Sequence, residues 1–498
     1  MAVRRYVANA DTTITNAFKS NLSTRGTGSN MGLADVSEVF SIYAQTNATS
    51  SETARVLTKF PVSSISVDRT NGTIPASGSV SFYLRLYNAR HTQTLPKNFS
   101  LDISALSRDW EEGTGLDMEN YTDLTYEETG ANWIHASSGV TWTAEGGDYF
   151  STVGSSFSAS FSDGTEDLSV DITPLVEQWV NSAGNVLGSK SNYGVVVRFP
   201  SAQEAETRSY YTKKFFARGT EFWFKRPVIE ARWDSSKKDS AGSFFLSSSL
   251  ATAAENLNRL YLYNNIRGQL RNIPGVGTAK IRLSLYSGSS DNTTVSGDKL
   301  FLPVGGGVAS VGHTNITGNY VSTGIYSASF AYASSSITTV FPVWHSGSLD
   351  SATVYHTGSA IKVRTFNSVD YNPSPSYVTT VTNLKQVYSR DEEARFRLYI
   401  RQKDWNPTIY SKAKSDPQNL IVEDAYYRII RTIDETDVVG YGTGSLNHTR
   451  LSFDVSGNYF DLPVDLLEKD YMYGIKLLYK LPNGFYKEQP YTFKFRVE

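Results

Sequence analysis

Residues 395–401 read Arg-Phe-Arg-Leu-Tyr-Ile-Arg, and this stretch decides the fold class. Apolar residues stand at every second position, at Phe396, Leu398 and Ile400, and three of the other positions are arginines. Successive side chains of a β-strand point to opposite faces, so this segment would have one apolar face and one polar face. Such strands are typical of antiparallel sheets that bury one face against a core and leave the other in water.

The same alternation recurs in residues 81–87 and again in residues 493–497 at the end of the chain. The composition agrees, because 31 Tyr, 25 Phe and 37 Gly in 498 residues suit short strands joined by turns. The best helical segment is 171–180, where Thr173 can cap and Pro174 suits the first helical position. The sequence therefore predicts an all-β protein of antiparallel β-sandwich domains, jelly-roll or immunoglobulin-like in type.

The length of the chain indicates about three domains. Two segments are typical of linkers, the charged and serine-rich residues 234–240 and the Asn-Pro-Ser-Pro-Ser run at 372–376. They divide the chain into three expected sandwiches: 1–233, a domain rich in Ser, Gly and Thr at 241–370, and an immunoglobulin-like or fibronectin-like domain at 377–498.

The formal net charge is −2, and basic residues are interspersed with acidic ones. Because no basic block is present, binding to nucleic acid is not expected. No apolar run reaches the roughly 18 residues of a membrane span, and no signal peptide is visible at the start. The chain has no cysteine, which excludes disulfides and thiol catalysis.

The six histidines form none of the spacings that bind zinc on a helix. Glu111 and Glu112 are adjacent, and neighbours on a strand point to opposite faces, so they are poorly placed as a glycosidase pair. We therefore expect no enzymatic activity, no catalytic residues and no cofactor or metal. Calcium ligands in the turns at Asp291, Asn292 and Asp416 remain an open alternative to plain solvated turns.

Tryptophans are the candidate contact residues. Trp133 follows the loop at 130–132 and is expected to be exposed, where it could stack on a sugar ring or a protein partner. Trp405 is the second candidate of this kind. Three other tryptophans are expected mainly as core anchors: Trp110, Trp142 and Trp179.

Tyrosine is abundant in the last part of the chain. Tyrosine is enriched at protein interfaces, but it is also a common strand residue, so about half of these positions are expected to be plain strand positions. The residues concerned are Tyr426, Tyr427, Tyr459, Tyr471, Tyr473, Tyr479, Tyr486 and Tyr491.

A series of segments in the first 233 residues follows a recognisable order. They are Ala10–Ile14, Arg55–Ser63, Asp109–Gly115, Val140–Trp142, Asp171–Trp179, Asn192–Val197 and Lys225–Glu230. In this order they resemble the DNRLRE family of β-sandwich domains, which occur in secreted bacterial proteins and in phage proteins, some of which bind polysaccharide. This sequence departs from the family in a long insertion before Arg55 and in a loose match at 213–218.

The charged third domain resembles virion structural proteins of contractile-tailed marine phages, including cyanophages. The segments concerned are 391–400, 403–407, 422–427 and 454–462. The resemblance implies a virion structural protein of the neck, tail, baseplate or head decoration. It would bind other virion proteins, form a homo-oligomer, and be assembled in the host cytoplasm and released by lysis. The alternative is a carbohydrate-binding adhesin for host surface glycans.

Overall fold

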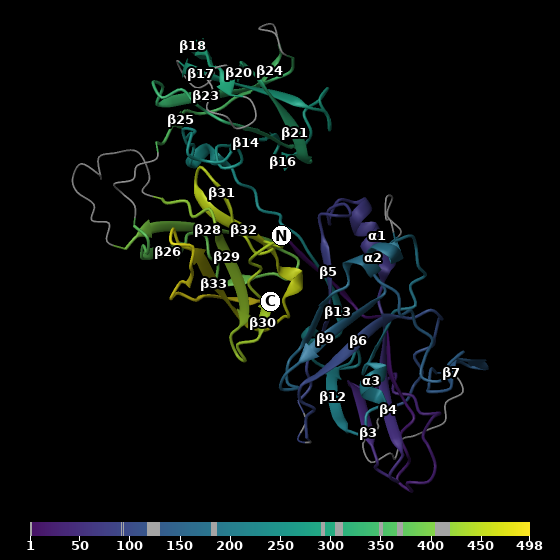
Figure 1. Ribbon diagram of the computed structural model, residues 1–498. Helices are drawn as coiled ribbons and strands as arrows, with labels where there is room; N and C mark the ends of the chain where they lie inside the picture. The colour runs from purple at the N-terminus through teal and green to yellow at the C-terminus, as the bar shows by residue number, and fades with distance from the viewer. Residues whose placement is uncertain are drawn as a thin grey trace. The chain divides into compact units, whose positions relative to one another are not determined.

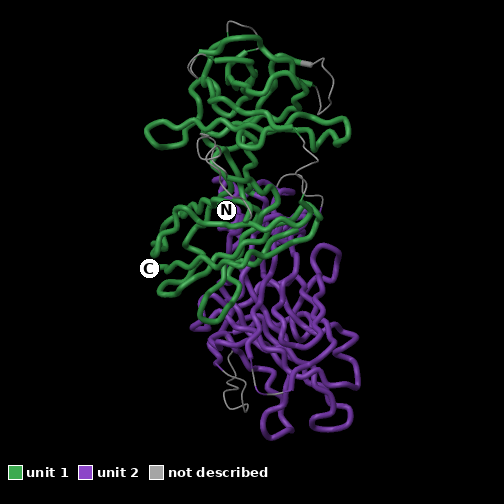
Figure 2. The backbone as a smooth tube through the Cα atoms, turned by 90° about the vertical axis from the view of Figure 1, so that its left-hand side faces the viewer, with its two compact units in different colours: residues 1, 235–443, 449–498 green, residues 2–234, 444–448 purple. Residues whose placement is uncertain are grey.

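The computed structural model describes residues 2–498 except 91, 93, 117–129, 181–186, 290–293, 304–311, 348–351, 366–371 and 404–418. The chain divides into two compact units, which Figure 2 colours separately. One contains residues 2–234 with 444–448, and the other contains residues 235–443 with 449–498. Antiparallel strands dominate both units, which confirms the all-β prediction.

The first unit is built on two antiparallel sheets (Figure 1). The smaller sheet has, in order, β1 (Val3–Val7), β13 (Val228–Arg232), β5 (Ser81–Leu86) and β10 (Leu168–Asp171). The larger sheet has β12 (Tyr210–Phe216), β3 (Val36–Tyr43), β4 (Ser51–Lys59), β11 (Val195–Arg198), β6 (Phe99–Ala105) and β9 (Ser156–Phe161), and β2 (Ala10–Thr15) also pairs with β4. A separate short ribbon is formed by β7 (His135–Ser137) and β8 (Val140–Thr141).

The main hydrophobic core of this unit lies between its two sheets. Phe82 and Leu84 of β5 belong to it, as the alternation predicts, and so do Leu101 and Ile103 of β6. The central strands β4 and β11 are buried on both faces, because a second cluster covers the other face of the larger sheet. Strands β4 and β11 therefore lack the solvated face that is typical of an antiparallel sandwich strand.

The helices of the first unit are α1 (Val62–Thr70), α2 (Thr173–Val180) and the short α3 (Ser201–Glu204). Helix α2 confirms the helix expected near residues 171–180, but Thr173 is not its cap. The Asp171 Oδ1 accepts from the Thr173 N–H at 2.9 Å, and the Thr173 hydroxyl oxygen accepts from the Phe82 N–H at 2.8 Å. Helix α1 was not expected; a bidentate ion pair between Arg69 and Glu177 of α2, at 2.6 and 2.7 Å, joins the two helices.

Residues 258–362 form an eight-stranded antiparallel sheet in the second unit. Its path is β14 (Asn258–Tyr263), β22 (Ile325–Phe330), β21 (Ile316–Ser322), β17 (Ile281–Ser289), β23 (Thr339–His345) and β24 (Val354–Thr357). β18 (Val295–Lys299) pairs with β17, and β25 (Ile361–Lys362) pairs with β23. Its core includes Leu283, Tyr326 and Trp344. Two short ribbons accompany it: β15 (Asn265–Ile266) with β16 (Gln269–Leu270), and β19 (Leu302–Pro303) with β20 (Gly312–His313).

Residues 377–497 form a sandwich of two further sheets, called the C-terminal sandwich below. One has β26 (Tyr377–Val381), β28 (Glu393–Gln402), β32 (Gly457–Pro463) and β31 (Ser452–Asp454). The other has β27 (Val387–Tyr388), β35 (Phe493–Val497), β33 (Met472–Lys480), β29 (Ala425–Arg431) and β30 (Asp437–Val439), and β34 (Tyr486–Glu488) pairs with β33. The pair β27–β35 is parallel.

Aromatic rings fill the core of the C-terminal sandwich. Phe396 of β28 lies 5.0 Å from Phe460 and 5.6 Å from Phe495 between ring centroids. Tyr427 of β29 stacks on Phe460 at 4.2 Å. The alternation at 395–401 therefore places its apolar residues inside, as predicted. Because these rings come from both sheets, their packing holds the two layers together.

The main segment of the first unit ends at Asp234, the first residue of the expected linker at 234–240. The sheets before and after residues 372–376 share no strand among the described residues, although both belong to the second unit. A division of that unit into domains 241–370 and 377–498 therefore stays a prediction. Within the part of the chain that the structure describes, no helix is long and apolar enough to cross a membrane.

Candidate functional site

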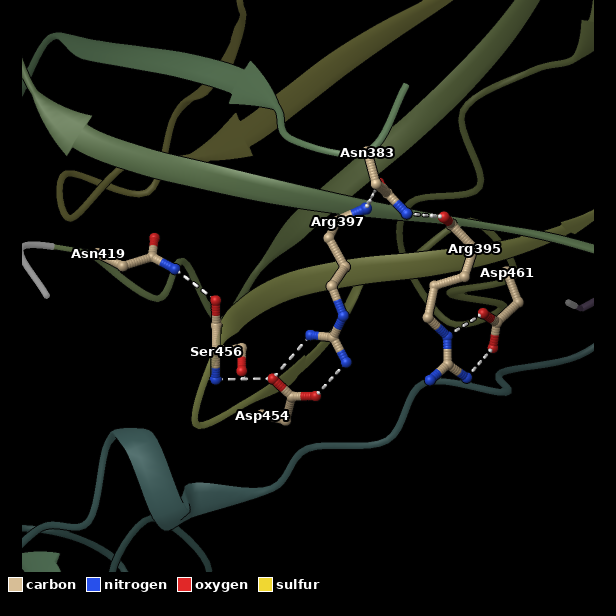
Figure 3. Close-up of polar contacts among 7 residues, drawn as sticks. All are labelled: Asn383, Arg395, Arg397, Asn419, Asp454, Ser456 and Asp461. Atoms are coloured by element: carbon tan, nitrogen blue, oxygen red, sulfur yellow. Dashed lines mark hydrogen bonds and ion pairs between the residues drawn. The ribbon is translucent and has the colours of Figure 1, made fainter. Parts of the chain in front are cut away.

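The outer face of the C-terminal sandwich carries two bidentate ion pairs (Figure 3). Arg395 lies directly opposite Asp461 on the neighbouring strand β32, and the Asp461 carboxylate accepts from it at 2.6 and 3.0 Å. Arg397 donates to both carboxylate oxygens of Asp454 at 2.9 and 3.1 Å. Both guanidinium groups also lie over the ring of Tyr459, at 4.6 and 5.2 Å from its centroid. Charge pairing and stacking together fix these side chains.

Two asparagine side chains fasten the surrounding backbone (Figure 3). The Asn383 Oδ1 accepts from the Arg397 N–H at 2.8 Å, and its Nδ2 donates to the Arg395 carbonyl at 2.6 Å. Asn419 donates from Nδ2 to the Ser456 carbonyl at 2.6 Å, and its Oδ1 accepts from the backbone of β28 at 3.0 Å. An amide side chain offers both a donor and an acceptor, so it can replace a missing strand partner.

The segment 237–239 adds a short parallel pairing to the edge of β31. The Asp239 N–H donates to the Phe453 carbonyl, and the Phe453 N–H donates to the Lys237 carbonyl, both at 3.0 Å. The Lys237 N–H also donates to the Ser452 hydroxyl at 3.0 Å. Addition of an extended segment to a sheet edge satisfies backbone groups that would otherwise be unpaired. Part of the expected linker is thus held by the C-terminal sandwich.

Asp239 is a strongly perturbed carboxyl group beside this face. Its side chain is only 8% exposed, and burial, assisted by the nearby Asp454 carboxylate, raises its pKa to about 7. A hydrogen bond from the Ala241 N–H to Asp239 Oδ1, at 3.1 Å, opposes this shift. Burial also lowers the pKa of Lys237. The face therefore has one carboxyl group that exchanges its proton near neutral pH.

The two ion pairs join strands β28, β32 and β31 of one sheet. The carboxylates of Asp454 and Asp461 each accept hydrogen bonds from two arginine nitrogens. Among the described residues no group of three or more His, Cys, Asp or Glu side chains could hold a metal ion. The candidate calcium positions Asp291, Asn292 and Asp416 lie outside the described residues.

Trp133 does not occupy the position expected of it. It is 5% exposed and packs in the hydrophobic cluster on the far face of the larger sheet, with the Arg55 guanidinium 5.0 Å from its ring centroid. The expectation of an exposed stacking platform is therefore wrong for Trp133. Asn132 explains the burial, because its Oδ1 accepts from the N–H groups of Ile134 and His135 and folds the loop inward.

The three tryptophans expected as core anchors are buried. The Trp110 indole N–H donates to the Tyr193 carbonyl at 2.8 Å, and the Trp142 indole N–H donates to the Asn132 carbonyl at 2.9 Å. Trp179 lies in the main core of the first unit. Trp405, the other candidate contact residue, lies outside the described residues.

A polar cleft of about 480 Å³ lies in the first unit, lined in part by Arg55 and Tyr149. Arg108 donates to the Asp148 carboxylate across it at 2.8 Å. Burial acts to raise the pKa of Asp148, but hydrogen bonds, chiefly from the backbone of Thr143 and the next residue, hold it below its usual range. The full lining is Arg55, Ser107, Arg108, Thr143, Ala144, Glu145, Gly147, Asp148 and Tyr149.

The tyrosines of the C-terminal sandwich divide into buried and exposed sets. Of the eight tyrosines singled out in the sequence, Tyr471 is half-buried, and five are buried in strands: Tyr426, Tyr427, Tyr459, Tyr473 and Tyr479. Tyr486 and Tyr491 are exposed, and Phe485, which sequence reasoning missed, is 73% exposed in the turn before β34. Phe485 and Tyr486, at the turn between β33 and β34, are called the aromatic tip below. The signal available in the sequence was the turn motif Pro482-Asn483-Gly484 directly followed by an aromatic pair.

Comparison with known proteins does not extend this description. No family model matches the chain, and no curated protein matches it either. The resemblances to DNRLRE domains and to phage virion proteins therefore stay predictions.

Proposed function

We propose that the protein is a structural component of a tailed bacteriophage virion, in the neck, tail, baseplate or head decoration, and that it acts by protein–protein binding without catalysis. The observation that carries the proposal is the aromatic tip, which presents Phe485 and Tyr486 on a hairpin. The sequence resemblances of the third domain and of residues 1–233 support the same assignment. Neighbouring virion proteins and further copies of this chain would be the partners.

The chemistry of the aromatic tip suits an interface anchor. Aromatic rings bury a large apolar area at low cost in side-chain entropy, and a few such residues carry most of the free energy of binding. Strand β34 also carries charge beside the tip, since Lys476 donates to Glu488 at 3.0 Å. An apolar centre with a polar border is the usual composition of a protein interface. Many copies in one particle would add avidity to a modest single contact.

A virion location agrees with the composition. The chain has no cysteine, so its sandwiches hold together by packing and hydrogen bonds in a reducing compartment. Assembly in the host cytoplasm and release by lysis would expose such a protein to both reducing and oxidising surroundings without changing its covalent structure.

Mass spectrometry of purified particles tests the proposal. We expect the wild-type protein at a fixed copy number, and about a tenfold or greater loss of incorporation for Phe485→Ser combined with Tyr486→Ser. Val455→Ser is the matched control, because Val455 is 67% exposed in another turn of the same sandwich. Absence of the wild-type protein from particles, or full incorporation of the double variant, would refute the proposal.

A carbohydrate-binding adhesin is the alternative, and the polar cleft of the first unit is the observation that favours it. Its lining combines an aromatic ring, Tyr149, with charged groups that can bind hydroxyls, Arg108 and Asp148. A glycan array with wild-type protein and Tyr149→Ala tests this function. Binding that the variant loses supports it, and failure of the wild-type protein to bind any glycan removes it.

A further inference from the structure

Lys213 of β12 is a lysine inside the first unit, with 0% of its surface exposed. Its Nζ donates to the Gly164 and Glu166 carbonyls, both at 2.8 Å, and to the Asn88 Oδ1 at 2.5 Å. The rings of Phe161 and Phe215 flank the nitrogen at 5.3 and 4.9 Å. Lysine is rarely buried so completely, so the position needs a reason.

Asn88 follows β5 and is held in place by its backbone. The Asn88 N–H donates to the Asp167 carboxylate at 2.8 Å, and Asn88 forms an isolated antiparallel bridge with Phe215 of β12. The next residue, Ala89, donates its N–H to the Lys214 carbonyl at 3.1 Å. The segment that follows β5 therefore runs along β12 and brings the side-chain amide of Asn88 to the amine of Lys213.

We propose that Lys213 and Asn88 form an intramolecular isopeptide bond. The lone pair of Lys213 Nζ attacks the Asn88 Cγ, and an Nζ–Cγ bond replaces the Cγ–Nδ2 bond. One proton of the attacking amine passes to the departing amide nitrogen, which leaves as ammonia. The other stays on the new secondary amide. The step is an acyl transfer between an amide and an amine, so it needs neither an oxidant nor a co-reactant.

Burial shifts the amine of Lys213 toward its neutral, nucleophilic form. Burial lowers the pKa of Lys213 to about 8, and the charges of Glu166 and Asp167 only partly oppose this. A substantial minority of molecules therefore has a neutral amine near neutral pH. The contact between Lys213 Nζ and the Asn88 side chain is short, and Lys213 is fully buried. The two reacting groups are therefore already held together, which is the main requirement for a slow acyl transfer.

The bond would be a covalent cross-link within the first unit. Asn88 and Lys213 are 125 residues apart; Asn88 lies just after β5 of the smaller sheet, and Lys213 lies on β12 of the larger sheet. A cross-link over such a long loop restricts the unfolded chain strongly, as a disulfide does. This protein has no cysteine, so an amide cross-link would stabilise the first unit without redox chemistry. The inference does not depend on the proposed virion function.

Mass spectrometry of the denatured full-length protein tests the bond. The wild-type mass should be lower than the sequence mass by one ammonia, and a tryptic digest should contain one branched peptide with both Lys213 and Asn88. Lys213→Arg keeps the positive charge but lacks the nucleophilic amine, so it should have the full sequence mass. Lys214→Arg, at the neighbouring position on β12, is the matched control and should still lose ammonia.

Two results would overturn the inference. One is a wild-type mass equal to the sequence mass, with Lys213 and Asn88 in separate linear peptides. The other is a loss of ammonia that persists in Lys213→Arg, which would place the reaction elsewhere in the chain. Because the decisive measurement uses the wild-type protein, a variant that fails to fold does not weaken it.

Discussion

Burial raises the pKa of Asp239 to about 7, although hydrogen bonds to its carboxylate oppose this shift. The free energy of unfolding therefore depends on pH. The folded protein binds this proton more tightly than the unfolded chain, whose aspartates titrate near pH 4. The contribution of the group to stability is therefore complete below about pH 4 and is lost as the pH rises through about 7. The local pattern Lys237-Lys238-Asp239 does not predict this burial, because it depends on segments distant in the sequence, including Asp454 and Tyr261.

Asp239→Asn should remove this pH dependence. Asparagine keeps the acceptor for the Ala241 N–H and cannot ionise, so above pH 7 the variant should unfold with a free energy about 1–3 kcal/mol larger than the wild type. Urea unfolding at several values between pH 4 and pH 8 measures the effect. Asp391→Asn, at an exposed aspartate of the same sandwich, should follow the wild-type curve. A variant Asp239→Asn with the wild-type slope would contradict the assignment.

At the scale of single elements, strand β11 depends on the glycine that precedes it. Gly194 has φ +83°, and a Cβ there would lie 2.1 Å from the Thr58 carbonyl oxygen of β4. Gly194→Ala should therefore cost about 3 kcal/mol or more in unfolding free energy, from the positive φ and the clash together.

Gly188 separates the two causes. It has φ +76° with nothing within 4 Å of the added Cβ, so Gly188→Ala should cost only about 1 kcal/mol. Denaturant unfolding followed by tryptophan fluorescence compares the two variants. Equal losses of unfolding free energy in the two variants would show that the close approach of β11 to β4 contributes nothing to the cost of Gly194→Ala.

The elements differ in how far the sequence predicts them. Strand β28 and helix α2 have clear periodicity, so their inward faces follow from the pattern. Helix α1 has a β-branched-rich sequence and buries only Val62 and Ile65, so its 3.6-residue period is weak. The burial of Trp133 depends on a second cluster on the far face of the larger sheet, which no local pattern encodes. The pair of Arg395 with Asp461 likewise depends on the register between β28 and β32, and the pair of Arg397 with Asp454 depends also on the register between β32 and β31.

At the scale of the whole molecule, the core of the first unit is separate from the cores of the second unit, in the sheet of residues 258–362 and in the C-terminal sandwich, which predicts that the two units unfold in separate transitions. Leu101 of β6 and Leu477 of β33 are both fully buried, one in each unit. Leu101→Ala should lower the melting temperature of one transition, and Leu477→Ala should lower that of the other. Each substitution should reduce the unfolding free energy of its own unit by about 2–5 kcal/mol.

Differential scanning calorimetry of the full chain tests this division. The two substitutions remove the same apolar group, so each serves as the control for the other. If the core of each unit is complete in itself, the cavity left by one substitution weakens only the unit that contains it, and the double variant shows both shifts added. A single transition that both substitutions move together would mean that the chain unfolds as one cooperative body. The boundary near Asp234 would then separate two compact units that unfold together in one transition.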